Sequence, residues 1–198
     1  MKKLTAVFLA MLLLCGCAAI EEGGETLPAG DFSAPQDTGA SQCLAILARV
    51  WEQYSAEAPF SVYGGSPEQP VYGAPAVLPD GSRRILETQF SIPSELSREL
   101  TEGAAVTHLF NEKIFRAAVF YLPSGTDSAA VAGKITRRLR VDAPLKQPPQ
   151  RLLAAEAAPG YLVLASGDAE YVTLFADKLK ALFGGTKIFF LDMLPKAV

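Results

Sequence analysis

The sequence has few of the residues on which most catalytic and metal sites depend. Its 198 residues include three cysteines, one histidine and one tryptophan. A single histidine and the lack of a CxxC pair argue against the usual zinc sites. No GxSxG, HExxH, P-loop or GxGxxG pattern occurs in the sequence. We therefore predict a protein that is not an enzyme, with no catalytic residues, no metal site and no cofactor.

The chain also lacks an excess of charge in its main part. The net charge is −3, and it arises in one segment. Residues 18–42 carry five acidic residues and no basic one, whereas residues 43–198 carry 16 basic and 16 acidic residues. A neutral domain gives no electrostatic basis for binding nucleic acid, so no nucleic-acid partner is expected.

The N-terminus has the layout of a secretory signal peptide. Lys2 and Lys3 precede an uninterrupted apolar run that ends at Leu14, and small residues follow. This ending resembles the bacterial lipobox: Leu14, Gly16 and Cys17 fit it, and Cys15 departs from it. The resemblance implies that residues 1–16 are removed and that Cys17 carries a diacylglycerol. We expect a lipoprotein anchored in the cell membrane, on its extracytoplasmic face.

A membrane span that is not cleaved is the alternative for this segment. Counted through Ile20, the apolar run has 17 residues, at the lower edge of the roughly 17 to 25 that a spanning helix needs. We favour the lipoprotein because the apolar region is short and the signal has two parts. In both cases Lys2 and Lys3 keep the N-terminus inside, which places the domain outside the cytoplasm.

A tether and a single domain follow the signal. Residues 17–40 combine the lipidated cysteine with glycine, proline and acidic residues, a composition typical of a disordered linker. Residues 41–198 are predicted to form one domain. Once Cys15 is removed and Cys17 is acylated, only Cys43 remains, so no internal disulfide can form. We expect Cys43 to be a small buried side chain.

The first part of the domain contrasts a clear helix with an irregular segment. Apolar residues recur at helical spacing over Ser41–Ser55, and Trp51 is expected in the core. Residues 56–84 are rich in proline and glycine and are predicted to be a loop. Within it, Tyr63 and Tyr72 belong to a repeated Val-Tyr-Gly, and the segment is either a binding loop or a surface excursion whose tyrosines pack on the core. We favour the second interpretation because long loops without packed structure are uncommon in compact domains.

The remaining patterns predict alternating strands and helices. The expected elements are a strand at Ile85–Ile92, a short helix at Ser94–Glu102, a hairpin of Ala104–Phe110 and Ile114–Leu122, a helix capped by Thr126 or Asp127, an alanine-rich helix at Leu152–Ala158, a strand at Tyr161–Ala165, a helix after Asp168 and a strand at Lys187–Leu191. This order indicates an α+β domain. We expect a mixed or antiparallel sheet of three to five strands covered by helices in a two-layer sandwich.

From Phe90 to Phe183 the sequence resembles the DUF4358 family, small uncharacterised lipoproteins of Gram-positive gut bacteria. The resemblance comprises the hairpin that ends at Leu122, the helix with an arginine-rich end at Arg140, and the run from Gly160 through Asp168 into the last helix. It covers about half of the chain, and the segment 56–84 does not match. The resemblance implies architecture and location, but no activity.

A basic cluster is the best candidate for a binding site. Lys134, Arg137 and Arg138 share one face of a predicted helix, and Arg140 lies nearby. Such a cluster can hold phosphate groups of lipid headgroups, teichoic acids or another anionic wall polymer. The alternative, which the frequency of such faces favours, is a solvated surface whose charges suit the helix C-terminus. His108 lies in a predicted strand without a triad partner nearby in sequence, so we expect a structural or surface role for it.

Three classes of function remain open on the sequence alone. The first is a membrane-anchored, non-catalytic binding or adaptor module of the cell envelope, and we favour it. Its partner would be an envelope protein or an anionic wall polymer. The second is an envelope hydrolase or transferase whose site assembles only in three dimensions, which replacement of His108 would inactivate. The third is a passive structural lipoprotein.

Overall fold

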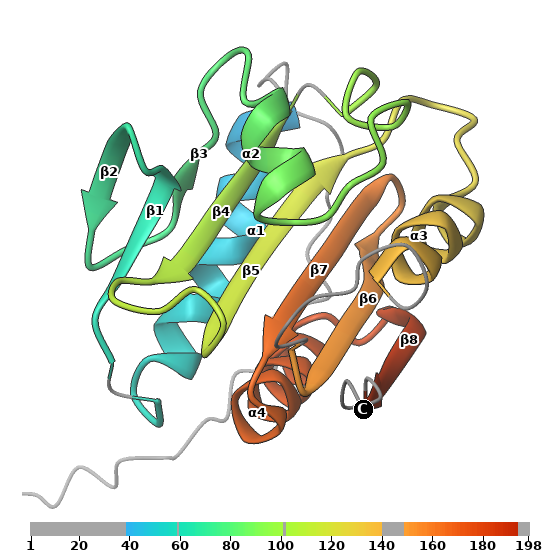
Figure 1. The fold of residues 1–198 in the computed structure, drawn as a ribbon. Helices are drawn as coiled ribbons and strands as arrows, with labels where there is room; N and C mark the ends of the chain where they lie inside the picture. The colour runs from blue at the N-terminus through green and yellow to red at the C-terminus, as the bar shows by residue number, and fades with distance from the viewer. Residues whose placement is uncertain (1–38, 59, 101, 140–148, 194–198) are drawn as a thin grey trace, which may run out of the picture. The chain divides into compact units, whose positions relative to one another are not determined.

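The computed structural model describes residues 39–58, 60–100, 102–139 and 149–193 (Figure 1). The predicted signal peptide 1–16, Cys17 and the tether up to residue 38 lie outside the described residues, as does Arg140. All the described residues belong to one compact unit, residues 31–198.

The described part of the chain contains four helices and eight strands. In chain order they are α1 (Gly39–Tyr54), β1 (Val62–Ser66), β2 (Gln69–Tyr72), β3 (Ala76–Val77), α2 (Arg83–Thr88), β4 (Gly103–His108), β5 (Phe115–Tyr121), α3 (Ser128–Arg137), β6 (Arg151–Ala158), β7 (Tyr161–Gly167), α4 (Ala169–Leu182) and β8 (Lys187–Met193).

All eight strands belong to one antiparallel sheet. Seven of them follow the order β2-β1-β4-β5-β7-β6-β8, and the short β3 pairs with β4 beside β1. The predicted α+β class is confirmed. The expected three to five strands were too few, because segments read as loop and helix from the sequence form β1, β2, β3 and β6.

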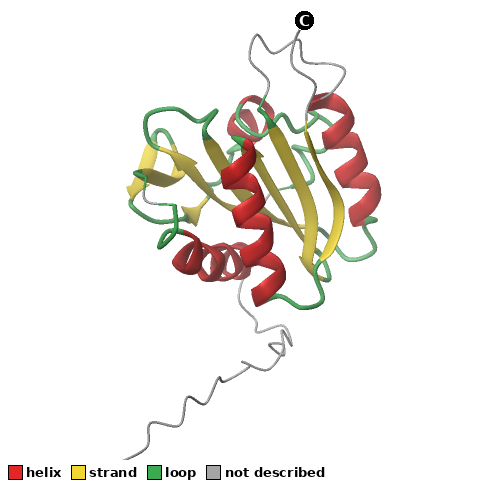
Figure 2. Ribbon diagram, turned by 90° about the horizontal axis from the view of Figure 1, so that it is seen from below, coloured by secondary structure: helices red, strands yellow, loops and turns green. Residues whose placement is uncertain are grey.

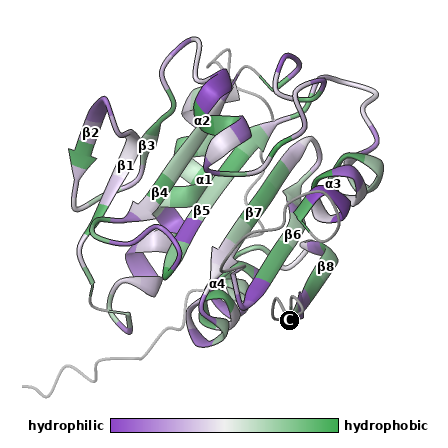
Figure 3. Ribbon diagram, viewed as in Figure 1, coloured by the Kyte–Doolittle hydropathy of each residue, from purple (hydrophilic) through white to green (hydrophobic). Residues whose placement is uncertain are grey.

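Helices cover both faces of the sheet, so the expected two-layer arrangement is not confirmed (Figures 1 and 2). The reason lies in the central strands, which are apolar on both sides (Figure 3). In β5, Ala117 and Val119 pack in one core cluster with α1 and α4, whereas Ala118 and Phe120 pack in a second cluster with α2 and α3. The sheet is therefore the middle of three layers.

Several elements agree with the sequence prediction. Helix α1 buries the predicted face, and Trp51 is 8% exposed. The hairpin β4–β5 forms with Ala105 opposite Ala118, and β5 lies centrally between β4 and β7. Helix α3 begins after Asp127, whose side chain accepts hydrogen bonds from the backbone of Ala129 and Ala130. Strands β7 and β8 and helix α4 also occur where they were predicted.

The segment 56–84 differs from the predicted loop. The repeated Val-Tyr-Gly forms the hairpin β1–β2, in which Tyr63 lies opposite Tyr72. Proline is tolerated here because Pro67 lies in the turn and Pro70 lies in the edge strand β2, where a missing N–H group costs no inner ladder bond. The segment therefore extends the sheet.

Three other elements were assigned wrongly. Residues 85–88, read as the start of a strand, belong to helix α2. Residues 94–99 form successive turns, not a regular helix. The alanine-rich segment 152–158 lies in strand β6 and not in a helix, because it pairs on both sides with β7 and β8. Tertiary pairing overrides the helix propensity of alanine in this position.

Candidate functional site

Helix α3 positions the predicted basic cluster. Val131 and Ile135 are buried toward the sheet, which turns Lys134 and Arg137 outward. Together with Arg138, these two side chains line one hollow of about 540 Å³, as the helical spacing suggested.

The lining of this α3 hollow is strongly basic. Its other members are Pro93, Glu95, Ala130 and Gly133. Three cations therefore face one carboxylate, in a domain whose acidic and basic residues balance. None of Lys134, Arg137 and Arg138 forms an ion pair with another described residue. Unpaired guanidinium and ammonium groups around one hollow can hold an anion by charge-assisted hydrogen bonds.

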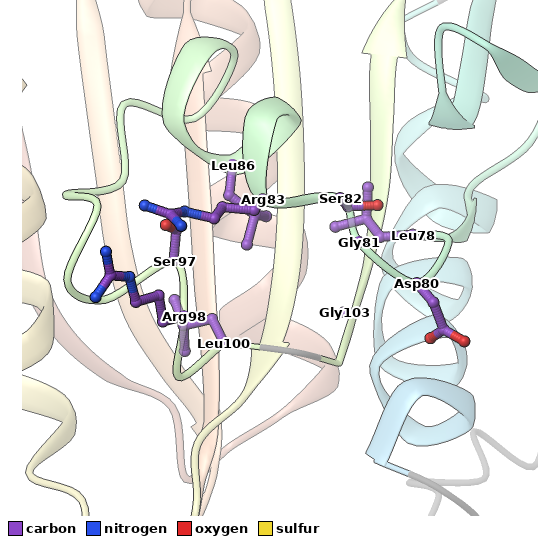
Figure 4. Close-up of a pocket in the computed structure, with 10 residues that line it drawn as sticks. All are labelled: Leu78, Asp80, Gly81, Ser82, Arg83, Leu86, Ser97, Arg98, Leu100 and Gly103. Carbon is purple, nitrogen blue, oxygen red and sulfur yellow. The ribbon is translucent and has the colours of Figure 1, made fainter.

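A second hollow, of about 420 Å³, lies beside α2 (Figure 4). We call it the α2 hollow. Its polar lining comes from Asp80, Ser82, Arg83, Ser97 and Arg98, and its apolar lining from Leu78, Leu86 and Leu100. The segment 93–100 contributes residues to both hollows.

Glu87, on α2, binds two of the residues that line the α2 hollow. Its Oε1 atom accepts hydrogen bonds from Arg83 Nε at 2.8 Å and from Ser97 Oγ at 2.7 Å. These two bonds, with the charges of Arg83 and Arg138, hold the pKa of Glu87 below its ordinary value. Glu87 thus orients Arg83.

The two candidate tyrosines are not brought to the basic cluster. Tyr63 and Tyr72 lie on β1 and β2, at one edge of the sheet, whereas α3 packs on β6 and β8 at the other edge. The hydroxyl of Tyr63 accepts a hydrogen bond from Gln89 Nε2 at 3.2 Å, and Tyr72 is 69% exposed. In the sequence the two tyrosines were linked only by their membership of the segment 56–84.

His108 has structural partners. Its Nδ1 atom accepts hydrogen bonds from the backbone N–H groups of Phe110 and Asn111, at 3.2 and 3.1 Å, and its ring packs 5.1 Å from the ring of Phe60. Burial lowers the pKa of His108. The neutral imidazole therefore caps the turn between β4 and β5.

Sequence reasoning gave no role to Arg116, which is buried at 8% exposure in the centre of the sheet. It lies opposite Thr107 on β4 and Ser166 on β7, and its Nε donates a 2.8 Å hydrogen bond to Ser166 Oγ. Burial lowers its pKa. The sequence feature that could have indicated a role for Arg116 is that it is the only charged residue in the apolar run 114–122.

Cys43 and the acidic residues form no metal centre in the part of the chain that the structure describes. Cys43 belongs to the buried face of α1 and is fully buried. Among the described residues, no group of three or more histidine, cysteine, aspartate or glutamate side chains is placed to hold a metal ion. Within the same residues, every helix is too short or too polar to span a bilayer.

The chain was also compared with known proteins. No family model, no curated protein and no solved structure matches it. The resemblance to DUF4358 therefore stays a prediction.

Proposed function

We propose that this protein is a lipid-anchored, extracytoplasmic binding module without catalytic activity, and that the α3 hollow binds an anionic component of the cell envelope. The anchor is Cys17 and the tether is residues 17–40, as their sequence indicates. Two acyl chains on one cysteine suffice for stable attachment to a membrane.

The observation that carries the binding proposal is the convergence on one hollow of three cations, none of which forms an ion pair with another described residue. Lys134 and Arg137 lie in the last turn of α3 and Arg138 is its C-cap, and the buried Val131 and Ile135 hold this helix on the sheet. A rigid helix keeps the three charges at fixed spacing, which favours a polymer or surface with repeated negative groups. Glu95 also lines the hollow, and its carboxylate would repel a negative group placed next to it.

A charge-matched pair of variants tests the binding site. Lys134→Gln/Arg137→Gln removes two charges from the α3 hollow, whereas Lys178→Gln/Lys180→Gln removes two from α4, on the opposite face of the sheet. The probe is fluorescent poly(glycerol phosphate), titrated against the full chain in a non-ionic detergent. We expect the α3 variant to lose most of its affinity and the α4 variant to keep it. Equal losses in the two variants would reject the site.

The anchor is tested separately. Intact mass and membrane fractionation of the full chain are compared with Cys17→Ser in a bacterial host. We expect a chain that begins at Cys17 with the mass of a diacylglycerol added, and loss of both the mass and the membrane retention in the variant. A soluble, unmodified chain with the native cysteine would reject the lipoprotein.

A further inference from the structure

Opposite charges line the α3 hollow without pairing. The exposed Glu95 lines this hollow together with the three cations. Among the described residues, no ion pair includes Glu95 or any of these cations. The space of about 540 Å³ therefore has positively charged hydrogen-bond donors on one part of its lining and a carboxylate, which only accepts hydrogen bonds, on another. A ligand that satisfies both parts carries anionic groups and hydroxyl groups.

A phosphate ester of a polyol has this composition. Its phosphate groups accept charge-assisted hydrogen bonds from guanidinium and ammonium groups. The free hydroxyl group of a glycerol unit can donate a hydrogen bond to a carboxylate, and such a bond to a charged acceptor is stronger than one between neutral groups. A polymer of phosphate alone has no hydroxyl donor and would place a negative group next to Glu95. Glu95 therefore favours a hydroxylated phosphate polymer.

Gly133 lines the same hollow on the outward face of α3. It lies inside the helix, and a Cβ atom at this position would meet no atom of another described element within 4 Å. Neither the backbone conformation nor the packing of the domain requires glycine here, although glycine inside a helix is less stable than alanine. The missing side chain leaves the helix backbone open to close approach by a ligand, which is one established use of glycine.

The residues that α3 contributes also give the hollow a direction. Ala130, Gly133 and Arg137 are exposed and recur at spacings of three and four residues, so they follow one line along the helix. Lys134 and Arg138 are four residues apart, about 6 Å along the helix axis, and neighbouring phosphate groups of a glycerol phosphate chain lie at a comparable distance. A slender chain can follow α3 with successive phosphate groups on successive cations. A flat bilayer surface would touch the ends of the long side chains and would not reach the backbone at Gly133.

We infer that the ligand of the α3 hollow is a linear polyol phosphate polymer of the glycerol phosphate type. Its phosphate groups bind Lys134, Arg137 and Arg138, its hydroxyl groups donate hydrogen bonds to Glu95, and its chain passes over Gly133. This inference rests on the proposed function, because it requires that the hollow binds an anion. It adds the chemical class of that anion and two residues that select it.

Matched oligomers test the role of Glu95. A glycerol phosphate oligomer and its deoxy analogue, in which propanediol replaces glycerol, have the same charges at the same spacing and differ only in the hydroxyl groups. Each oligomer competes with fluorescent poly(glycerol phosphate) for the full chain in a non-ionic detergent. We expect the wild-type protein to bind the glycerol oligomer several-fold more tightly than the analogue, and Glu95→Ala to remove this preference.

Glu99→Ala is the matched control for this comparison. Glu99 is exposed in the same segment and does not line the α3 hollow, so its replacement removes an equal charge and should keep the preference. Equal binding of the two oligomers by the wild-type protein would overturn the inference, as would equal effects of the two variants. If Lys134→Gln/Arg137→Gln still loses affinity in that case, the anion site remains and only the assignment to a polyol phosphate fails.

Gly133→Ala separates a polymer in the hollow from a membrane surface. Phosphatidylglycerol in mixed detergent micelles presents the same phosphate and hydroxyl groups on a layer of headgroups. We expect Gly133→Ala to weaken binding of the glycerol oligomer several-fold and to leave competition by the micelles unchanged. The variant should unfold at a higher temperature than the wild-type protein, so unfolding does not account for the lost affinity. If the micelles compete as well as the oligomer at equal phosphate concentration, and Gly133→Ala changes neither, the ligand is a lipid surface and the inference is overturned.

Discussion

The hydroxyl group of Ser128 donates a 2.7 Å hydrogen bond to Oε1 of Glu156, and this bond joins the first turn of α3 to strand β6. The same carboxylate accepts a bond from the backbone of Gly160 at 3.2 Å and forms an ion pair with Lys187 on β8 at 3.1 Å. One side chain therefore connects a helix, a turn and two strands. It fixes α3, and with it the basic hollow, on the sheet.

Replacement of Glu156 should destabilise the domain in a pH-dependent manner. Burial works to raise the pKa of Glu156, but the bonds from Ser128, Gly160 and Lys187 outweigh it and lower the pKa. We expect Glu156→Gln to reduce the free energy of unfolding by about 1–3 kcal/mol at neutral pH, as measured by urea denaturation. The exposed Glu52→Gln should change it by less than about 0.5 kcal/mol.

The pH dependence of this difference has a defined sign. Because the folded pKa of Glu156 is depressed, its stabilisation is complete above the unfolded value of about 4.3 and is lost as the pH falls through the lower folded value. The gap between wild type and Glu156→Gln should therefore shrink below about pH 4.3. A gap that widens as the pH falls would contradict the observed contacts.

His108 should titrate below its ordinary pKa. Burial is the largest effect on it and lowers the pKa, against smaller opposing effects of its own backbone and of Asp168. The chain has one histidine, so a single ring signal in an NMR titration reports it. We expect a midpoint below about 6.5. Stability from the neutral ring is then present above that value and lost as the pH falls through the folded pKa, and a midpoint above 6.5 would contradict the cap.

Gly64 should not tolerate a side chain, whereas Gly133 should. A Cβ atom at Gly64 would lie 2.2 Å from the backbone nitrogen of Ala76, where β1 and β3 approach one another. We expect Gly64→Ala to cost about 1–3 kcal/mol of unfolding free energy. Gly133 lies inside α3 with open space around it, so Gly133→Ala should stabilise the domain by about 0.5–1 kcal/mol. Thermal unfolding of the two variants would reveal opposite signs.

Cys43 should be unreactive in the folded protein. Burial, assisted by the negative charge of Glu102, raises the pKa of its thiol to about 12, so almost no thiolate forms at neutral pH. We expect iodoacetamide to leave Cys43 unlabelled under native conditions and to label it in urea, as followed by peptide mass mapping. Rapid labelling of the native protein would show that α1 opens from the sheet.

Local patterns predicted the elements whose residues carry their own signals. Helices α1 and α4 show an apolar face at helical spacing, and α3 has Asp127 as its cap. The hairpin β4–β5 combines two apolar runs with a short polar turn. In each case the side chains that stabilise the element lie within the element or next to it, so the sequence alone contains the information.

The failures depend on partners that are distant in the chain. Strand β6 is rich in alanine and forms a strand because β7 and β8 pair with it on both sides. The strands of the segment 56–84 form because His108, Thr107 and Val106 of β4 provide a ladder for β1. The two-layer expectation failed for the same reason, since strands that pair centrally bury both of their faces.

The candidate sites show the same difference between local patterns, which the sequence reveals, and distant partners, which it does not. The cations of the α3 hollow lie within five residues of one another, and their helical spacing placed them on one face. Arg83 and Arg98 come from α2 and from a turn, and only the tertiary structure joins them around one hollow. The partner of Arg116 is Ser166, fifty residues away, so no local pattern could reveal it.

The bond between Ala40 and Glu102 also determines how mechanical load enters the domain. A force applied through the N-terminal segment first reaches the start of α1, which is bound to Glu102 and packs on β4 and β5. These strands have neighbours on both sides, so their displacement requires the rupture of several ladders at once, whereas an edge strand peels away bond by bond. A domain pulled through the start of α1 is thus held at the centre of its sheet, away from the edge strand β2.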